Sequence, residues 1–446
     1  MNFKKTSMAL TLAAAMVAGP VLAHESEDGG IPRLEHVFVI VMENHGYDQI
    51  VNNPDEPFVN GLIGSGKVSY AKNYFAVGHP SLNNYLEIVG GSNFGVRSDN
   101  APAWHGLTTC VNTLGGTISA DNYAGTATVP VSGDNICPIT GSGTDAGTEP
   151  IDNWNEVSGT FPFLANIDGV KSIPKAPTIG MTIADQLGSN WKSYQESLPN
   201  SGADNVTYSN GTVTDLTANT FPNAAQLPNV ANLPNTYDSK GNQITPNGYL
   251  KLYAAKHNPF VYFKSVQEGG LNNVVSFDGS SGLYADLARG SVPAFSLIAP
   301  NQCNDQHGRG NGDSFCSYDN IDNGGQAGLN SGNILQGDAT VERLVTSIKA
   351  SPAWSQGNNA IVIVWDENDY SGAAALDKNG NYPAGAPNNR VLVTVETNYR
   401  QSPAVASTQY YNHFSLLKSI EAGLDLPCLN HACDHDVKVM SDLFGR

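Results

Sequence analysis

Positive charge is scarce in this chain of 446 residues. Lysine and arginine together number 23, against 41 aspartates and glutamates, and the formal net charge is −18 at pH 7. Such a balance disfavours binding to the phosphate backbone of nucleic acids and to anionic membrane surfaces. Neither class of partner is expected. A small anionic substrate is still compatible with this charge where cations in the site neutralise its carboxylates.

Long apolar runs are also missing, apart from one short run near the start. Lys4 and Lys5 precede an apolar stretch over residues 8–18, and the small residues around Ala23 offer a cleavage site. This pattern is typical of a secretory signal peptide over residues 1–23, and its apolar core is too short to span a membrane. We therefore expect a periplasmic or secreted protein with no integral membrane segment.

No CxxC motif occurs among the six cysteines, which argues against a zinc site built from cysteine. The cysteines fall as near neighbours along the chain, and an oxidising compartment favours disulfides between them. Six cysteines can pair in many ways. The simplest expectation is three local pairs: Cys110 with Cys137, Cys303 with Cys316, and Cys428 with Cys433.

The distribution of apolar residues indicates an α/β fold. Five apolar runs are typical of buried parallel strands, at residues 37–42, 260–263, 294–298, 360–365 and 391–395. Helical patterns lie between them, at residues 182–188, 338–348 and 414–422, with Asp338 as an expected N-cap. This alternation predicts a mostly parallel central sheet flanked by helices.

Two stretches interrupt the alternation, near residues 91–170 and 199–247. Both are rich in small and polar residues such as glycine, asparagine and threonine. We expect them to be loop-rich insertions that form a cap over one edge of the sheet. No repeat of fixed period is visible. The sequence therefore predicts a single catalytic domain over residues 24–446 that carries these insertions.

Carboxylate, amide and imidazole side chains follow four of the expected strands. In open α/β sheets, binding sites form at the carboxyl ends of the strands. These side chains are therefore expected to meet in one polar cleft. They are Glu43, Asn44 and His45; Asp305 and His307; Asp366 and Glu367; and His413.

Ser81 lies at an expected helix start in the segment GHPSLNNYL. Backbone N–H groups and the helix dipole favour an anion at such a position. Taken alone, however, a serine there is explained by an N-capping role.

Six segments in chain order resemble the bacterial phosphoesterase family, which holds secreted acid phosphatases and phospholipases C and has an alkaline phosphatase-like fold. They are VIVMENHGYDQI, GHPSLNNYL, NDQHG, QGDATVERLV, IVWDENDYSG and YNHFSLLKSIEAGLDL. The resemblance covers most of residues 38–426. The chain departs from the family pattern at Asn83, Gln306 and Gly308, where proline, methionine and aspartate are common.

The resemblance implies roles for the residues at the strand ends. Ser81 would be the nucleophile, forming a phosphoserine, and His307 a second catalytic residue. One or two divalent cations would be held by Glu43, Asn44, Asp305, Asp366, Glu367 and His413. The substrate phosphate would be contacted by His45, His79 and His257. The ligand types leave the metal open among Mg²⁺, Ca²⁺, Mn²⁺, Zn²⁺ and iron.

We therefore predict a secreted metal-dependent phosphoric ester hydrolase, a phosphomonoesterase of acid phosphatase type that acts on a small-molecule or lipid phosphoester. The alternative is a phospholipase C or another phosphodiesterase. Larger phospholipases of this family carry extra C-terminal domains, and 33 residues follow His413 here (446 minus 413), so the phosphatase is preferred.

Two further classes are disfavoured. A sulfatase needs proline two residues and arginine four residues after its nucleophile, where Asn83 and Tyr85 follow Ser81. A non-catalytic carbohydrate-binding protein would suit the polar insertions, but it gives no reason for Ser81 and four polar strand ends to occur together.

Overall fold

The computed structural model describes residues 30–96, 99–100, 102, 136–140, 142–144, 177–198, 236–237, 243–244, 253–308, 326–369 and 389–445. The expected signal peptide and most of both expected insertions lie outside these residues. In the described part, no helix has the length and apolarity needed to cross a bilayer.

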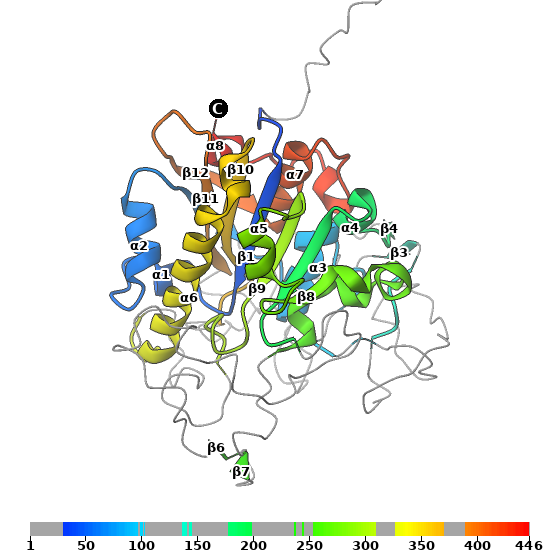
Figure 1. Ribbon diagram of the computed structural model, residues 1–446, viewed down its shortest axis with the longest axis horizontal. Helices are drawn as coiled ribbons and strands as arrows, with labels where there is room; N and C mark the ends of the chain where they lie inside the picture. Colours follow the sequence, from blue (N-terminus) through cyan, green and yellow to red (C-terminus); the bar gives the residue numbers. More distant parts are fainter. Residues whose placement is uncertain are drawn as a thin grey trace, which may run out of the picture.

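An eight-stranded sheet forms the centre of the described part, in the order β12-β2-β11-β10-β1-β9-β5-β8 (Figure 1). Along the chain its strands are β1 His36–Met42, β2 Ser69–Phe75, β5 Trp191–Gln195, β8 Val274–Ser276, β9 Phe295–Ala299, β10 Asn359–Trp365, β11 Arg390–Thr397 and β12 Ala406–Asn412. Two small antiparallel pairs lie apart from it: β3 Ser142–Thr144 with β4 Pro177–Ile179, and β6 Thr236–Tyr237 with β7 Gln243–Ile244.

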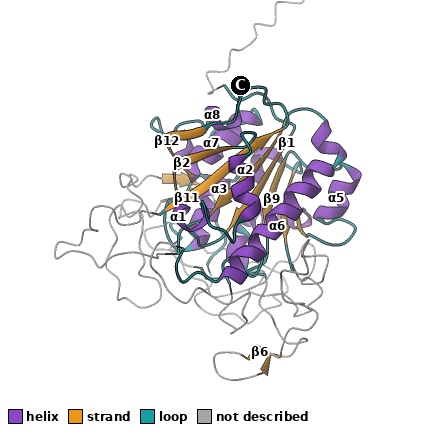
Figure 2. Ribbon diagram, turned by 90° about the vertical axis from the view of Figure 1, so that its left-hand side faces the viewer, coloured by secondary structure: helices purple, strands orange, loops and turns teal. Residues whose placement is uncertain are grey.

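Helices cover both faces of the sheet, with α2, α5 and α6 on one face and α3 and α7 on the other (Figures 1 and 2). The α-helices are α1 Tyr47–Ile50, α2 Pro57–Gly64, α3 Ser81–Gly90, α4 Ile183–Leu187, α5 Leu283–Arg289, α6 Ser331–Ala350, α7 His413–Gly423 and α8 Ser441–Phe444. Short 3₁₀ or π turns are η4 Ala255–His257, η5 Pro259–Tyr262, η6 Val266–Gly270, η7 Leu271–Asn273, η8 Pro352–Ser355 and η9 Asn430–Cys433.

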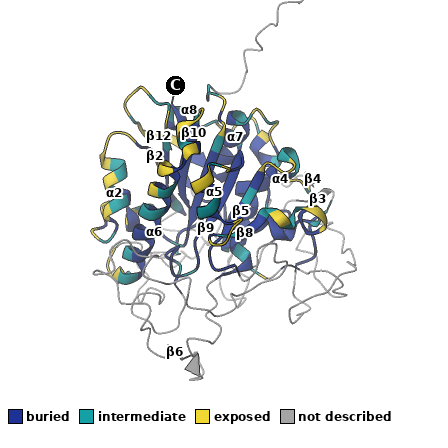
Figure 3. Ribbon diagram, viewed as in Figure 1, coloured by how far each residue is buried: buried dark blue, intermediate teal, exposed yellow. Residues whose placement is uncertain are grey.

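Five of the seven strand pairings in the sheet are parallel, which confirms the predicted α/β class with a mostly parallel sheet. The exception is β11, which pairs antiparallel with both β10 and β2. The prediction of a parallel strand at residues 391–395 was therefore wrong in direction. Figure 3 shows that the central strands are buried, whereas many exposed residues lie on the helices. The edge strand β12 is itself partly exposed.

Residues 260–263 are not the strand that was predicted. The chain forms the 3₁₀ turn η5 there, which begins at Pro259. Proline at the first position has a fixed φ that suits a helical turn and lacks the N–H that a strand ladder uses. The apolar side chains are buried all the same, and the ring of Phe260 packs 4.4 Å from that of Trp191.

Asp338 does not cap its own helix as predicted. Helix α6 begins earlier, at Ser331, and Asn330 caps it by accepting from the N–H groups of Gly332 and Asn333. The Asp338 carboxylate instead accepts from the backbone N–H groups of Phe58 at 2.8 Å and Val59 at 2.9 Å, in the first turn of α2. A side chain in the middle of one helix thus caps another.

Of the three predicted cysteine pairings, one lies wholly within the described residues. Cys428 and Cys433 form the predicted disulfide. Cys137 and Cys303 each take part in a disulfide bond. Their predicted partners, Cys110 and Cys316, lie outside the described residues.

The carboxyl ends of β1, β9 and β10 lie together because these three strands are parallel neighbours. Each residue of β1 from His36 to Met42 pairs with one of β10 from Asn359 to Trp365. One step further, the N–H of Asp366 donates to the carbonyl of Met42 at 2.9 Å, and that of Glu43 donates to the carbonyl of Asp305 at 2.8 Å. The polar ends of these three strands therefore emerge side by side, as predicted. The fourth predicted end, that of residues 391–395, was wrong, because β11 runs antiparallel and ends beside the start of β10; His413 instead follows β12.

Candidate active site

Ser81 is the first residue of α3, directly after a cis His79–Pro80 peptide bond. Its side chain is buried, yet its Oγ lies 3.2 Å from Glu43 Oε2 and 3.0 Å from Glu367 Oε1. A hydroxyl has one proton to donate, so it can satisfy only one ionised carboxylate at a time. Two carboxyl groups on one buried serine are more than a capping role requires.

The chain turns sharply where β1 ends. Asn44 has a φ of +60°, in the left-handed region that asparagine tolerates better than most residues. This turn directs the backbone N–H of Asn44 onto Asp366 Oδ1 at 3.0 Å. The contact of Asn44 with the acidic cluster is thus made by its backbone.

His257 lies between two carboxylates that come from different strands. Its Nε2 is 3.0 Å from Glu43 Oε1, and its Nδ1 is 3.2 Å from Asp305 Oδ2. Its ring also stacks on Tyr85, with centroids 5.3 Å apart and planes 8° from parallel. The three residues Glu43, His257 and Asp305 are all buried and bring their ligand atoms within 4.8 Å of one another, so they form a possible metal site.

The contacts of Glu43 and His257 set their ionisation, whereas burial raises the pKa of Asp305 to about 6 in spite of its contact with His257. Burial acts to lower the pKa of His257, but the charges of Glu43 and Asp305 outweigh it and raise that pKa above its usual value. Burial likewise acts to raise the pKa of Glu43, but His257 and Lys256 hold it well below its usual range. Glu43 and His257 therefore form a buried ion pair.

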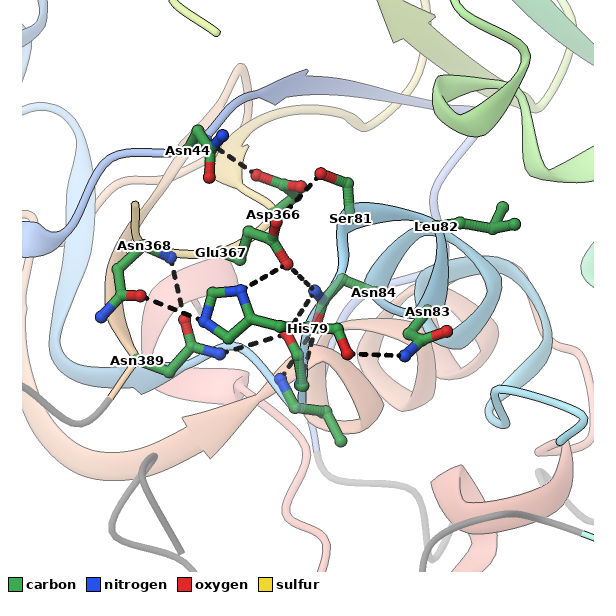
Figure 4. Close-up of polar contacts among 12 residues, drawn as sticks. Asn44, His79, Ser81, Leu82, Asn83, Asn84, Asp366, Glu367, Asn368 and Asn389 are labelled. Atoms are coloured by element: carbon green, nitrogen blue, oxygen red, sulfur yellow. Dashed lines mark hydrogen bonds and ion pairs between the residues drawn. The ribbon is translucent and has the colours of Figure 1, made fainter. Parts of the chain in front are cut away.

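Asp366 and Glu367 follow β10, and both are buried. Figure 4 shows their polar contacts. Glu367 Oε2 accepts from Asn84 Nδ2 at 3.0 Å and lies 2.9 Å from His79 Nδ1. Asp366 Oδ2 has no hydrogen-bond partner among the described residues. Burial raises the pKa of both carboxyls well above the usual range, and the charge of Glu43 adds to this effect.

His413, the first residue of α7, contacts the backbone just after the end of β10. Its Nε2 lies 2.6 Å from the backbone carbonyl of Asp366, and its Nδ1 lies 2.8 Å from Tyr74 Oη. These partners assign a neutral ring with the proton on Nε2, because a carbonyl can only accept. Burial lowers the pKa of His413 to about 4, in agreement with a neutral ring.

On the opposite side of Ser81, Lys256 and His307 lie close together. Lys256 Nζ is 3.2 Å from His307 Nε2 and 3.0 Å from Asp99 Oδ2. Burial, followed by the charge of Lys256, lowers the pKa of His307 to about 3. Burial also acts to lower the pKa of Lys256, but Asp99 and Glu43 raise it above its usual value. The lysine is therefore charged and the histidine neutral.

The structure thus brings together most of the residues named from the sequence, although their individual roles stay predictions. His45 and His79 were predicted to contact substrate. Both are buried behind the carboxylates: His45 Nδ1 contacts the carbonyl of Glu43 at 2.9 Å, and His79 lies between Glu367 and Asn368. His257, predicted for the same role, lies within the carboxylate cluster itself.

Sequence reasoning missed Lys256, Asp99 and Asn84. Lys256 directly precedes the flagged His257, and Asn84 follows Ser81 by three residues on α3, so both carried a positional signal. Asp99 had none, because it lies in a loop-rich stretch and reaches the site only through the tertiary fold.

Comparison with known proteins places part of the chain in a family context. Residues 321–427 match the model of the Phosphoesterase family, which confirms the resemblance found in the motifs. A phosphatidylinositol-3-phosphatase of Mycobacterium tuberculosis is 30% identical over 159 residues, or 34% of this chain. The chain spans about half the length of that relative, with 50% of it matched.

Solved structures also show likeness at low identity. A protein in the alkaline phosphatase superfamily from Vibrio parahaemolyticus gives a TM-score of 0.40 at 11% identity, covering 93% of this chain and 70% of that chain. The lipoteichoic acid synthase of Listeria monocytogenes gives 0.35 at 9% identity, covering 93% and 76%. At these scores, the likeness adds nothing to the sheet order and site geometry described above.

Proposed function

We propose that this protein is a metal-dependent phosphoric ester hydrolase, a phosphomonoesterase that acts through a phosphoserine on Ser81. The observation that carries the proposal is the environment of Ser81 Oγ. It begins a helix, lies within hydrogen-bond distance of Glu43 and Glu367, and has Lys256 Nζ at 3.4 Å. The match of residues 321–427 to the Phosphoesterase family supports the same chemistry.

In the proposed reaction, Ser81 Oγ attacks the phosphorus of the ester. Its proton passes to Glu43, which lies within reach and is held ionised by His257 and Lys256, whereas burial favours the protonated form of Glu367. The bond from Oγ to phosphorus forms as the bond to the alcohol oxygen breaks, and the alcohol leaves with a proton from solvent. Water then hydrolyses the phosphoserine, which releases inorganic phosphate and restores Ser81.

The residues present fit a divalent cation. Buried carboxylates from three strands converge with His257, and the Oδ2 atom of Asp366 is buried with no hydrogen bond to the described residues. Glu43, Asp305 and Asp366 would hold the ion, with Glu367 at its edge, and His257 would join them only after losing the proton that it carries in the ion pair with Glu43. When bound, a divalent ion neutralises carboxylates, lowers the pKa of a nearby hydroxyl and offsets the charge on phosphoryl oxygens.

A phosphomonoester is preferred over a diester as the substrate. The Mycobacterium relative is a phosphatidylinositol-3-phosphatase, an enzyme that removes a terminal phosphate. Its aligned segment supports the phosphomonoesterase over a phospholipase C, which would cleave between glycerol and phosphate.

The test compares the wild-type protein with Ser81→Ala on p-nitrophenyl phosphate, phosphatidylinositol 3-phosphate, bis(p-nitrophenyl) phosphate and phosphatidylcholine. Loss of a nucleophile costs on the order of 10³-fold or more in kcat, so the variant should be inactive on the monoesters. Acid-quenched wild-type protein should carry phosphate on Ser81 by peptide mass spectrometry. Ser355→Ala, which changes an exposed serine in η8, is the matched control and should keep full activity.

Two results would count against the proposal. Undiminished monoester hydrolysis by Ser81→Ala would remove the phosphoserine. Cleavage of the diesters with no release of phosphate from either monoester would favour the phosphodiesterase alternative.

A further inference from the structure

The ammonium group of Lys256 lies beside the proposed nucleophile Ser81 and has one acceptor for each of its three N–H donors. Lys256 lies in η4, directly before His257, and its side chain is 14% exposed. Its Nζ reaches Asp99 Oδ2 at 3.0 Å, His307 Nε2 at 3.2 Å and Ser81 Oγ at 3.4 Å. A lysine ammonium has three N–H donors and no acceptor. Each donor therefore has one acceptor, and one of the three is Ser81.

The partners of His307 show which of the two residues carries the proton. The Nδ1 atom of His307 lies 2.9 Å from the carbonyl of Gly308, to which it must donate. Its Nε2 then holds a lone pair, which accepts from Lys256. His307 consequently shows no N–H towards Ser81, and the positive group on this side of the nucleophile is Lys256.

Two backbone N–H groups at the start of α3 already have acceptors within the protein and do not point at a bound anion. The N–H of Leu82 donates to Asp99 Oδ1 at 3.0 Å, and that of Asn83 donates to the carbonyl of Pro80 at 3.1 Å. The backbone N–H groups of the second and third helical residues are thus engaged within the protein. The same Asp99 carboxylate holds Lys256 through its other oxygen, so it fixes the ammonium next to the helix start.

We propose that Lys256 is a catalytic residue whose ammonium binds the phosphoryl group that is transferred to Ser81. This inference rests on the proposed phosphoester hydrolysis and assigns a residue that the sequence motifs did not name. Two N–H donors of Lys256 stay on Asp99 and His307, and the third, which points at Ser81 Oγ, is shared with a non-bridging phosphoryl oxygen. Lys256 keeps its three protons throughout. Asp99 and His307 are positioning residues that aim it.

A fixed cation at this place opposes the repulsion between an anionic ester and the acidic cluster. Glu43 and Glu367 both contact Ser81, and Asp366 adjoins them. Hydrogen-bond donors aimed at the oxygens of the transition state are worth more in a buried site than in water. The role requires charge and reach, and arginine retains both, whereas methionine keeps only the length of the chain.

The experiment measures two quantities on Lys256→Met and Lys256→Arg: the dissociation constant of inorganic phosphate by calorimetry, and kcat and KM on p-nitrophenyl phosphate. We expect the methionine variant to bind phosphate at least about 10-fold more weakly and to lose about 10²- to 10³-fold in kcat. The arginine variant should recover at least about a tenth of the wild-type kcat. Metal content should be unchanged in both.

The matched control is Lys264→Met. Lys264 is 31% exposed and pairs with Glu268 at 3.2 Å on the protein surface, so its loss should leave phosphate affinity and kcat unchanged. Thermal unfolding of each variant verifies that it is folded. If the methionine variant does not fold, Lys256→Gln replaces it with the same expectations.

Unchanged phosphate affinity in a folded Lys256→Met protein would overturn the inference. So would a loss of phosphate binding that is matched by loss of bound metal, because Lys256 would then act through the metal ligands. Ester hydrolysis that does not depend on Lys256 would leave the proposed function standing. Phosphate binding that depends on Lys256, in a wild-type protein that hydrolyses no ester, would instead refute the proposed function and keep the anion site.

Discussion

The acidic groups of the site fall into two halves that differ in how their charge is balanced. In the half formed by β1, β9 and η4, His257 contacts both Glu43 and Asp305, at 3.0 and 3.2 Å. In the half formed by the end of β10, Asp366 and Glu367 are adjacent in sequence and equally buried, and Asp366 accepts a backbone N–H in place of a cation.

The difference shows that burial alone does not decide whether a carboxyl is charged. Glu43 and Asp366 are both fully buried. Contact with a cation holds the pKa of Glu43 well below its usual range, whereas burial raises that of Asp366 well above it. The half formed by β10 is therefore where an added metal ion would change the electrostatics most.

The largest effect on activity is expected when the charge of Asp366 is removed. We expect Asp366→Asn to lower kcat on p-nitrophenyl phosphate by about 10³-fold, because it removes a carboxylate from the proposed cation site. Metal analysis of the purified variant should show less bound ion than in wild type. Asp278→Asn, at an exposed position, is the control and should keep both activity and metal.

The Asp366→Asn change should lower activity, but it should raise the stability of the metal-free protein. Since the folded-state pKa of Asp366 is raised, the native state binds more protons than the unfolded chain, and stability falls as pH rises above the unfolded value of about 3.9. Asp366→Asn should therefore stabilise the metal-free protein at pH 7. A lower free energy of unfolding at that pH would show that the Asp366 carboxylate is already balanced within the protein.

In the half formed by β1, β9 and η4, where His257 contacts both carboxylates, removal of a charge should destabilise the protein. His257→Asn leaves Glu43 and Asp305 buried without their shared cation, and breaking a buried pair in this way costs about 3–5 kcal/mol of folding free energy. The raised pKa of His257 gives stability that is fully present below pH 6.5 and is lost as pH rises through about 10. The lowered pKa of Glu43 gives stability present above pH 4.5.

The difference between wild type and His257→Asn should accordingly be largest near pH 6 and shrink towards pH 10, as measured by urea denaturation of metal-free protein. Addition of Mn²⁺ should restore part of the lost stability, since a cation can take the place of the imidazolium. Equal stability of the two proteins at pH 6 would show that the two halves do not differ in charge balance.

The smallest effect is expected at Glu421, a buried carboxyl in α7 that lies outside the cluster around Ser81. Burial raises its pKa to about 9. The native state then holds a proton that the unfolded chain releases, so stability falls as pH rises from about 4.5 to about 9. Glu421→Gln removes this slope and should stabilise the protein at pH 9 by about 1–3 kcal/mol, with unchanged kcat.

Thermal unfolding from pH 4 to pH 9 measures the slope at Glu421. Parallel curves for the variant and the wild type would mean that burial alone does not raise the pKa of this carboxyl. The control for the comparison is the activity assay, which the change should not affect.

The parts of the fold that were predicted correctly are those in which local pattern and tertiary role agree. β1, β9 and β10 consist almost entirely of apolar residues because helices cover both faces of the sheet, and polar residues follow at their carboxyl ends. β2 and β12 were missed: their sequences SYAKNYF and ASTQYYN mix polar with aromatic residues, as suits strands near an edge of the sheet.

The sequence predicted that the strand ends would converge at the site, but it did not predict which of the histidines there would be charged. From the sequence, His307 was predicted to be a catalytic residue and His257 to contact the substrate phosphate, with nothing to indicate their charge. The structure gives one of them two carboxylate neighbours and the other an ammonium, so their pKa values move in opposite directions. Such neighbours come from segments far apart in the chain, and no local sequence pattern specifies them.

The capping of α2 by Asp338 has a consequence for synthesis of the chain. The bond from Phe58 to Asp338 spans 280 positions. A ribosome that has made α2 must add four of the eight strands of the sheet, β2, β5, β8 and β9, before the carboxylate that completes the helix exists. Until then the first turn of α2 has only water to satisfy these N–H groups, so the helix reaches its final form late in translation.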